Sequence, residues 1–75
     1  MKFGERLKEV RKQNGLTQVE LAEVLGIHSI TVSRWEISAN QPPIKTLVDI
    51  AILFSVSADY LLGLDGMAEK EDSHI

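Results

Sequence analysis

The strongest structural signal in the chain is the run Gly15-Leu16-Thr17-Gln18-Val19-Glu20-Leu21-Ala22-Glu23-Val24-Leu25-Gly26-Ile27. Thr17 and Glu20 have the T-x-x-E spacing of a capping box, in which the threonine hydroxyl accepts from the Glu20 amide and the glutamate carboxylate accepts from the Thr17 amide. Gly26 is placed to end the helix, because glycine readily adopts the left-handed backbone conformation found there. The run therefore predicts a short helix between Thr17 and Gly26.

A second short helix follows the glycine turn, beginning near His28 or Ser29 and reaching Glu36. Two short helices joined by a tight turn that contains glycine are the signature of a helix-turn-helix. The small side chain of Ala22 permits the two helices to cross closely. The apolar contacts that fix the crossing are expected from Leu21, Leu25, Ile27, Val32 and Trp35. The outer face of the second helix is neither strongly charged nor laced with ion pairs.

Helices are also predicted on both sides of this pair. Residues Phe3 to Asn14 show the helical period, Ile37 to Pro43 form a loop, and Ser57 caps a last helix from Ala58 to Leu62. Between them, Ile44 to Phe54 form a helix whose apolar face is expected to consist of Ile44, Leu47, Val48, Ala51 and Phe54. No alternation typical of strands appears. We therefore expect an all-α fold of five helices.

The charges divide the chain into two parts. Residues 65–75 contain four carboxylates and one lysine, a net charge of −3, which equals the charge of the whole chain, so residues 1–64 sum to zero. One domain is expected over residues 1–64, followed by a short, acidic and flexible tail over residues 65–75. A neutral domain can carry a local basic face, but its electrostatic attraction to nucleic acid will be weak.

The composition also narrows the class of protein. The chain has no cysteine, which excludes disulfides and fits a reducing cytoplasm. It shows neither a signal peptide nor an apolar run long enough to span a membrane. With two distant histidines and no thiolate, we expect no metal site, no cofactor and no catalytic grouping, so the chain is not expected to be an enzyme.

Three further motifs accompany the quoted run, namely Val32-Ser33-Arg34-Trp35-Glu36, Pro42 and Ser57-Ala58-Asp59-Tyr60-Leu61-Leu62-Gly63. Together they resemble the lambda-repressor/Cro-like (XRE-type) helix-turn-helix DNA-binding family over about residues 4–64. The resemblance implies a five-helix domain whose second and third helices form the helix-turn-helix. It places the recognition helix, about Ser29 to Glu36, in the major groove of DNA. The function implied is sequence-specific DNA binding by a transcriptional regulator, with repression favoured over activation.

The resemblance also implies roles for individual residues. Base reading is expected from Ser29, Ile30, Ser33 and Arg34. Contacts with phosphates, or mixed contacts, are expected from Gln18, His28, Thr31, Asn40, Gln41 and Lys45. Arg11 and Glu36 match a structural ion pair that ties the first helix to the third. The chain departs from the family at Ile37-Ser38, where Asn-Gly or Arg-Gly is common, and at His28, where a serine or threonine usually caps the helix.

The expected partner is double-stranded DNA with a palindromic operator, bound by a homodimer, with no membrane and no small-molecule ligand. One recognition helix reads only a few base pairs, whereas two copies about 34 Å apart reach successive major grooves. The dimer interface is expected at the end of the chain, where apolar residues exceed what the core requires. Its members would be Tyr60, Leu61, Leu64 and Met67.

An alternative function uses the same helical fold as a protein-interaction module, such as an antitoxin or an adaptor. The acidic balance of the chain favours this alternative. The polar outer face of the helix from Ser29 to Glu36 favours DNA, because a face that docks a protein is richer in large apolar side chains. Alternatively, Arg34 could be a solvated surface arginine, and Ile30 could border the core rather than touch a thymine methyl group.

Overall fold

The computed structural model describes residues 2–64. These residues form five helices and no strand. The helices are α1 (Phe3–Gln13), α2 (Gln18–Leu25), α3 (Ser29–Glu36), α4 (Ile44–Phe54) and α5 (Ala58–Leu62). The all-α, five-helix prediction is confirmed, and α3 spans the predicted recognition helix. The expected acidic tail, residues 65–75, lies outside the described residues. No helix of the described part is long and apolar enough to cross a membrane.

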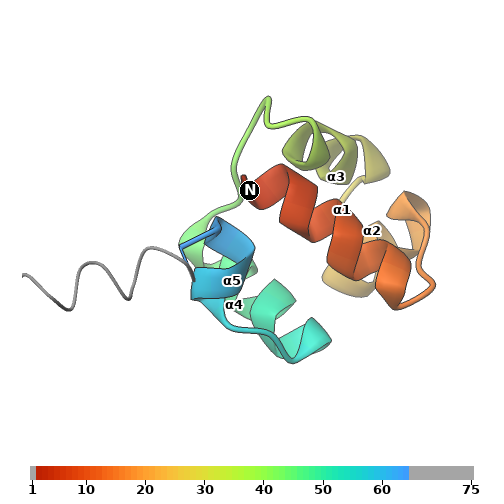
Figure 1. The fold of residues 1–75 in the computed structure, drawn as a ribbon. Coiled ribbons are helices and arrows are strands. Elements are labelled where there is room, and N and C mark those ends of the chain that lie inside the picture. Colours follow the sequence, from red (N-terminus) through yellow and green to blue (C-terminus); the bar gives the residue numbers. More distant parts are fainter. Residues whose placement is uncertain (1, 65–75) are drawn as a thin grey trace, which may run out of the picture.

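Helix α1 occupies the centre of the fold. It runs between α3 on one side and α4 and α5 on the other (Figure 1), and it packs against both α3 and α5. Helix α2 packs against α3 and α4. The buried side chains of all five helices meet in one core, which consists of Leu7, Val10, Leu21, Ala22, Val32, Trp35, Ile50, Phe54 and Leu61.

The helix-turn-helix is built by the local interactions expected from the sequence. Thr17 Oγ1 accepts from the Glu20 amide at 3.1 Å, and the Thr17 amide donates to Glu20 Oε1 at 2.8 Å, which confirms the capping box. Gly26 ends α2 in the left-handed conformation, with φ of 70°. The Ile27 amide then donates to the Ala22 carbonyl at 3.0 Å, and the chain turns sharply into α3.

Replacing Thr17 by alanine should lower the free energy of unfolding by about 1 kcal/mol, because the Glu20 amide loses its side-chain acceptor. Chemical denaturation of the two proteins measures the difference. Thr46→Ala is the matched control, because Thr46 lies in the first turn of α4 but the N-cap residue of that helix is Pro43. An unchanged midpoint for Thr17→Ala would mean that the cap does not stabilise α2.

The expected inner face of α4 is wrong in two members. Ile44 and Val48 are exposed, whereas Ile50, which was not assigned to the core, is fully buried. The physical reason is that α4 carries apolar side chains around most of its circumference. The period of apolar residues therefore does not single out the face that packs against the rest of the domain.

The expected dimer interface also needs correction. Leu61 is fully buried in the core, so it cannot contact a second copy, and Leu62 is the exposed leucine of α5. Tyr60 is half-buried and engaged within the chain: its hydroxyl donates to Glu9 Oε1 at 3.1 Å, and the Arg6 guanidinium lies 4.1 Å from the ring centroid. Leu64 is exposed, and Met67 lies outside the described residues.

A close approach of two backbones joins α1 to the end of α3. Gly4 is buried in the first turn of α1, where it faces the carbonyl groups of Trp35 and Glu36. A Cβ at this position would lie only 2.6 Å from the Glu36 carbonyl oxygen, and it would also overlap the Trp35 carbonyl oxygen. The packing of α1 on α3 therefore requires glycine at position 4, a constraint that the sequence analysis did not reveal.

Candidate nucleic-acid interface

Helix α3 has two faces with separate roles. Val32, Trp35 and Glu36 are buried and attach the helix to the domain. The opposite face is open to solvent: Ser29, Ile30 and Arg34 are exposed, and Thr31 and Ser33 are half-buried. The structure thus brings the four predicted base-reading residues onto the accessible side of one helix. Ile30 is exposed rather than part of the core rim.

The inner face of α3 is held by an ion pair with α1. Arg11 Nε donates to Glu36 Oε2 at 2.6 Å, and Arg11 Nη2 donates to Glu36 Oε1 at 3.1 Å, so the pairing is bidentate. Arg11 Nη1 also donates to the Leu16 carbonyl at 2.7 Å. Both residues are buried. This pair ties α1, the turn before α2, and the end of α3 into one unit.

The Glu36 carboxylate raises the pKa of Arg11, because its hydrogen bonds favour the charged guanidinium more than burial opposes it. A raised pKa means that this stabilising contribution is complete below the ordinary arginine pKa and is lost only as the pH rises through the higher value. Both lie far above neutrality. The contribution of Arg11 is therefore constant over the pH range in which proteins normally work.

Gln18 extends this network to the first turn of α2. Its Nε2 donates to Glu36 Oε1 at 3.0 Å, and the side chain is half-buried. A primary amide has two N–H donors, so one remains for another acceptor. The first amides of a helix also have no acceptor within the helix and attract anions. The N-terminus of α2 thus offers donors beside α3 at a position fixed by Glu36.

The electrostatics of this face differ from those of the whole chain. Glu36 is the sole carboxylate on α3, and it is buried and paired with Arg11. Arg34 in the last turn of α3 and Lys45 in the first turn of α4 are both exposed. The surface of α3 therefore carries an exposed positive charge and no exposed carboxylate, although residues 1–64 are neutral overall.

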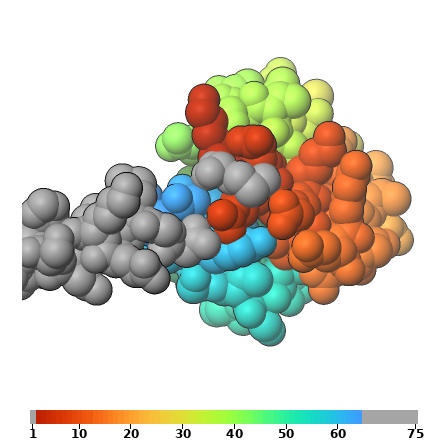
Figure 2. All heavy atoms as spheres, in the orientation of Figure 1, coloured from red at the N-terminus to blue at the C-terminus, as the bar shows by residue number. Residues whose placement is uncertain are grey.

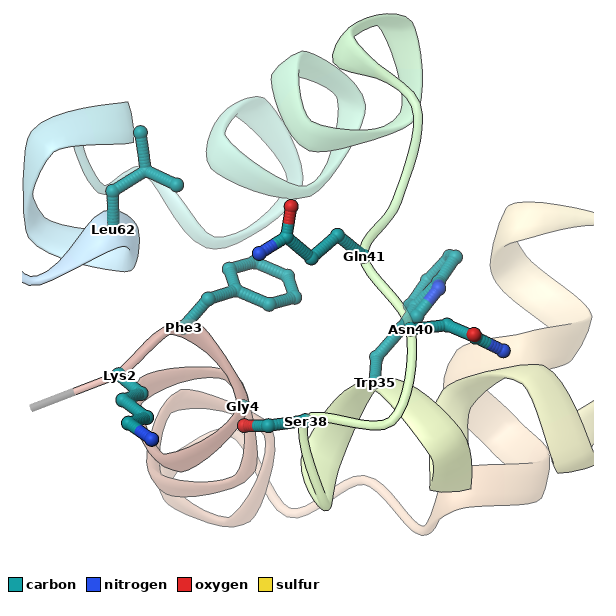
Figure 3. A pocket seen from close by; sticks show the side chains of 8 residues that line it. All are labelled: Lys2, Phe3, Gly4, Trp35, Ser38, Asn40, Gln41 and Leu62. Atoms are coloured by element: carbon teal, nitrogen blue, oxygen red, sulfur yellow. The ribbon is translucent and has the colours of Figure 1, made fainter.

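The loop between α3 and α4 separates two residues that were expected to act together. Asn40 and Gln41 are both exposed and both line a groove of about 360 Å³, together with residues of α1, α3 and α5. Figure 3 shows the Gln41 side chain directed toward Phe3, whereas Asn40 lies beside Trp35. Asn40 therefore stays close to α3, and Gln41 reaches toward the start of α1.

Two departures from the family pattern have visible effects. His28 takes the N-cap position of α3 without a side-chain capping hydrogen bond, and it is exposed. Ser38 adopts a left-handed conformation with φ of 63°, in the segment where glycine is common in the family. The chain therefore keeps the turn after α3 at the cost of an unfavourable serine conformation.

The crossing of α2 and α3, the glycine turn between them and the open outer face of α3 together define a helix-turn-helix domain. The model of the helix-turn-helix family matches residues 7–61, which is most of the chain. The protein belongs to this family, and its domain is of the XRE or lambda-repressor-like type.

Curated relatives include transcriptional regulators of bacteria and phages. The chain is 40% identical to the HTH-type transcriptional regulator ImmR of Bacillus subtilis (strain 168), over 75 residues that cover 100% of this chain and 59% of that protein. It is 35% identical to the cryptic phage CTXphi transcriptional repressor RstR of Vibrio cholerae serotype O1, covering 96% of this chain and 64% of the relative. The chain spans 52 to 59% of the length of three Bacillus subtilis regulators that it matches.

Two solved structures support the same assignment. The crystal structure of the P22 c2 repressor in complex with synthetic operator 9T matches with a TM-score of 0.77 and 31% identity, covering 83% of this chain and 94% of that chain. A transcriptional regulator from Listeria innocua matches with a TM-score of 0.78 and 32% identity, covering 83% of this chain and 58% of that chain. The lambda-repressor-like fold expected from the sequence is confirmed.

Proposed function

We propose that this protein binds double-stranded DNA in a sequence-specific manner and regulates transcription, with α3 as the recognition helix in the major groove. The observation that carries the proposal is the division of α3 into a buried face and an accessible face. Val32, Trp35 and Glu36 fix the helix, while Ser29 and Arg34 offer a hydroxyl and a guanidinium to base edges.

The contacts with the DNA backbone are proposed on either side of α3. Gln18 and the first amides of α2 would hold one phosphate, while His28 at the N-cap of α3, Thr31 in its first turn and Asn40 in the loop after it would contact others. These contacts set the position of the domain on the duplex and carry no sequence information. Base reading then falls to Ser29, Ile30, Ser33 and Arg34.

The comparisons support transcriptional regulation, and we propose repression as its direction. The relatives include transcriptional repressors, and the P22 c2 repressor was crystallised with an operator. An operator with two-fold symmetry would be read by two subunits, and we propose a homodimer on such a site. We also propose that the protein acts in the cytoplasm and without catalysis. The alternative function as a protein-interaction module is less well supported, because the accessible face of α3 is mostly polar and protein-docking faces are richer in large apolar side chains.

Selection of bound sites from a random DNA pool, followed by titration of the selected site and of unrelated DNA, tests the function directly. We expect enrichment of a two-fold symmetric sequence and tighter binding of that sequence than of unrelated DNA. Equal affinity for both, or no binding to either, would contradict sequence-specific regulation.

Replacing Arg34 by alanine should weaken binding to the selected site by about 1 to 3 kcal/mol and relax the preference at one base position. The reason is that an exposed arginine on α3 can pair with both acceptors of a guanine edge. Gln18→Ala serves as the comparison, because the loss of a phosphate contact weakens binding to all sequences alike. If Arg34→Ala weakens selected and unrelated DNA equally, Arg34 contacts a phosphate.

A further inference from the structure

The carboxylate of Glu36 accepts one hydrogen bond more than its ion pair requires. Its Oε1 atom accepts from two donors at once, Arg11 Nη2 at 3.1 Å and Gln18 Nε2 at 3.0 Å, while Oε2 accepts from Arg11 Nε at 2.6 Å. The Glu36 side chain is only 3% exposed, so the carboxylate is held in this position by its partners. The pairing of α1 with α3 is complete without the bond to Gln18, which therefore requires a separate explanation.

The bond to Glu36 determines which way the Gln18 amide points. A side-chain amide has an NH2 group on one side and a carbonyl oxygen on the other, and rotation about the last bond of the side chain exchanges them. An ionised carboxylate only accepts hydrogen bonds, so Glu36 holds the NH2 group toward itself and the carbonyl oxygen away. One N–H of Gln18 is bonded to Glu36, and the second N–H of the same group remains for another acceptor.

Only one of the two amide orientations suits an anion. Phosphate oxygens accept hydrogen bonds from an N–H, whereas a carbonyl oxygen turned toward them is repelled. We propose that Glu36 is a positioning residue for DNA binding, which acts through Gln18 by turning an N–H donor of that side chain toward a phosphate of the duplex. The inference rests on the proposed function. It gives the buried carboxylate a role in DNA affinity besides its role in stability.

The ion pair explains how a carboxylate can act so close to DNA without repelling it. The Arg11 guanidinium binds both oxygens of Glu36, so the two buried charges compensate each other. The neutral amide of Gln18 then lies between this pair and the phosphate. Glu36 thus supplies the geometry of an acceptor without adding an exposed negative charge to the interface.

The same network fixes the phosphate contact relative to the base-reading face. Glu36 belongs to α3, and Arg11 Nη1 also holds the Leu16 carbonyl at 2.7 Å, just before α2 begins. Figure 2 shows the orange surface that includes α2 bordering the yellow to yellow-green surface of α3, against which α2 packs. A phosphate bound at Gln18 is therefore held at a set distance from the bases that α3 contacts.

The first test is a double-mutant cycle on DNA affinity, measured at a temperature at which circular dichroism shows every variant folded. Gln18→Met removes the donors, and Glu36→Gln keeps the shape of the side chain but replaces one acceptor oxygen by an NH2 group. Each should weaken binding to selected and unrelated DNA by about tenfold, the loss expected for one hydrogen bond to a charged group. The double variant should bind as Gln18→Met does, because Glu36 acts through Gln18. Additive losses, roughly a hundredfold in the double variant, would overturn the proposal.

Two matched controls accompany the cycle. Gln13→Met makes the same change at an exposed glutamine of α1, and Glu23→Gln makes the same change at an exposed glutamate of α2. Neither should lower the affinity for DNA. A loss equal to that of Gln18→Met or Glu36→Gln in its control would show that the effect does not depend on the bond between the two side chains.

The second test separates positioning from a general loosening of the fold. Neutral methylphosphonates are placed one at a time along the selected site, and each position that contacts the protein should weaken binding. At one phosphate this loss should disappear in Gln18→Met, which identifies the phosphate that Gln18 holds. Glu36→Gln should become insensitive at the same phosphate and stay sensitive at the others. If Glu36→Gln changes the effect at all phosphates alike, its role is structural and the proposal is wrong.

The third test uses the free protein, so the orientation of the amide is measured apart from DNA recognition. In NMR spectra, the side-chain NH2 resonances of Gln18 should lie outside the range of those of the exposed Gln13, and Glu36→Gln should return them to that range. Resonances that do not move would refute the orienting role of Glu36. A protein that shows this shift and binds no DNA would refute the proposed function. A protein that binds DNA but shows additive losses in the cycle would refute only the positioning role.

Discussion

Replacing Glu36 by alanine should lower the free energy of unfolding by about 3 to 5 kcal/mol, because removing one partner leaves a buried charge without compensation. The Arg11 guanidinium would lose both of its hydrogen bonds to the carboxylate, and Gln18 would lose its acceptor. A domain of this size has a total stability of about 5 to 15 kcal/mol, so the change removes a large share of it.

Chemical denaturation of Glu36→Ala and of Glu23→Ala measures this effect, with Glu23 as an exposed glutamate on the neighbouring helix. The double variant Arg11→Met and Glu36→Leu should recover much of the lost stability, because an apolar pair removes the uncompensated charge. If Glu36→Ala costs no more than Glu23→Ala, the ion pair does not hold α1 and α3 together.

Gly4→Ala should destabilise the domain by about 3 kcal/mol, the upper end of what one extra methyl group costs in a tightly packed site. The direction is informative, because glycine to alanine inside a helix normally stabilises by about 0.5 to 1 kcal/mol. Here the added Cβ meets carbonyl groups of α3, and backbone atoms cannot rotate away as a side chain can. The helices α1 and α3 must therefore separate.

Gly15→Ala provides the comparison for this prediction. Gly15 has a positive φ of 71° and nothing within 4 Å of an added Cβ, so the substitution strains only the local backbone. We expect thermal unfolding to show a larger loss for Gly4→Ala than for Gly15→Ala. A Gly4→Ala protein as stable as the original would show that the contact between α1 and α3 tolerates a wider spacing.

The sequence predicted those parts of the fold that depend on neighbouring residues. The capping box of Thr17 and Glu20 and the glycine at position 26 act within a few residues, and the structure confirms both. The helix bounds were also predictable, because helix ends are set by neighbouring residues. The one difference in α1 is that it ends one residue earlier than expected. The ion pair of Arg11 and Glu36 was expected only through the resemblance to a known family, since no local pattern connects residues 25 positions apart.

The features that sequence reasoning missed depend on how distant segments meet. In α4, apolar residues on most sides left the buried face undetermined, and Ile50 was overlooked. In α5, a helix of five residues, either Leu61 or Leu62 could have faced the core. The requirement for Gly4 and the hydrogen bond from Gln18 to Glu36 arise between helices, so the spacing of residues along the chain gives no sign of them.

The division of α3 into a buried and an accessible face has a consequence for how such proteins diversify. Substitutions at Ser29, Ile30 and Arg34 touch neither the core nor the ion pair, so on the proposed function they would change which bases the helix contacts with little effect on stability. A library randomised at these positions should contain mostly folded members. On the proposed function, new operator preferences would arise one residue at a time through mostly folded intermediates, and the same scaffold could be reprogrammed in the laboratory by exchanging only the accessible side of one helix.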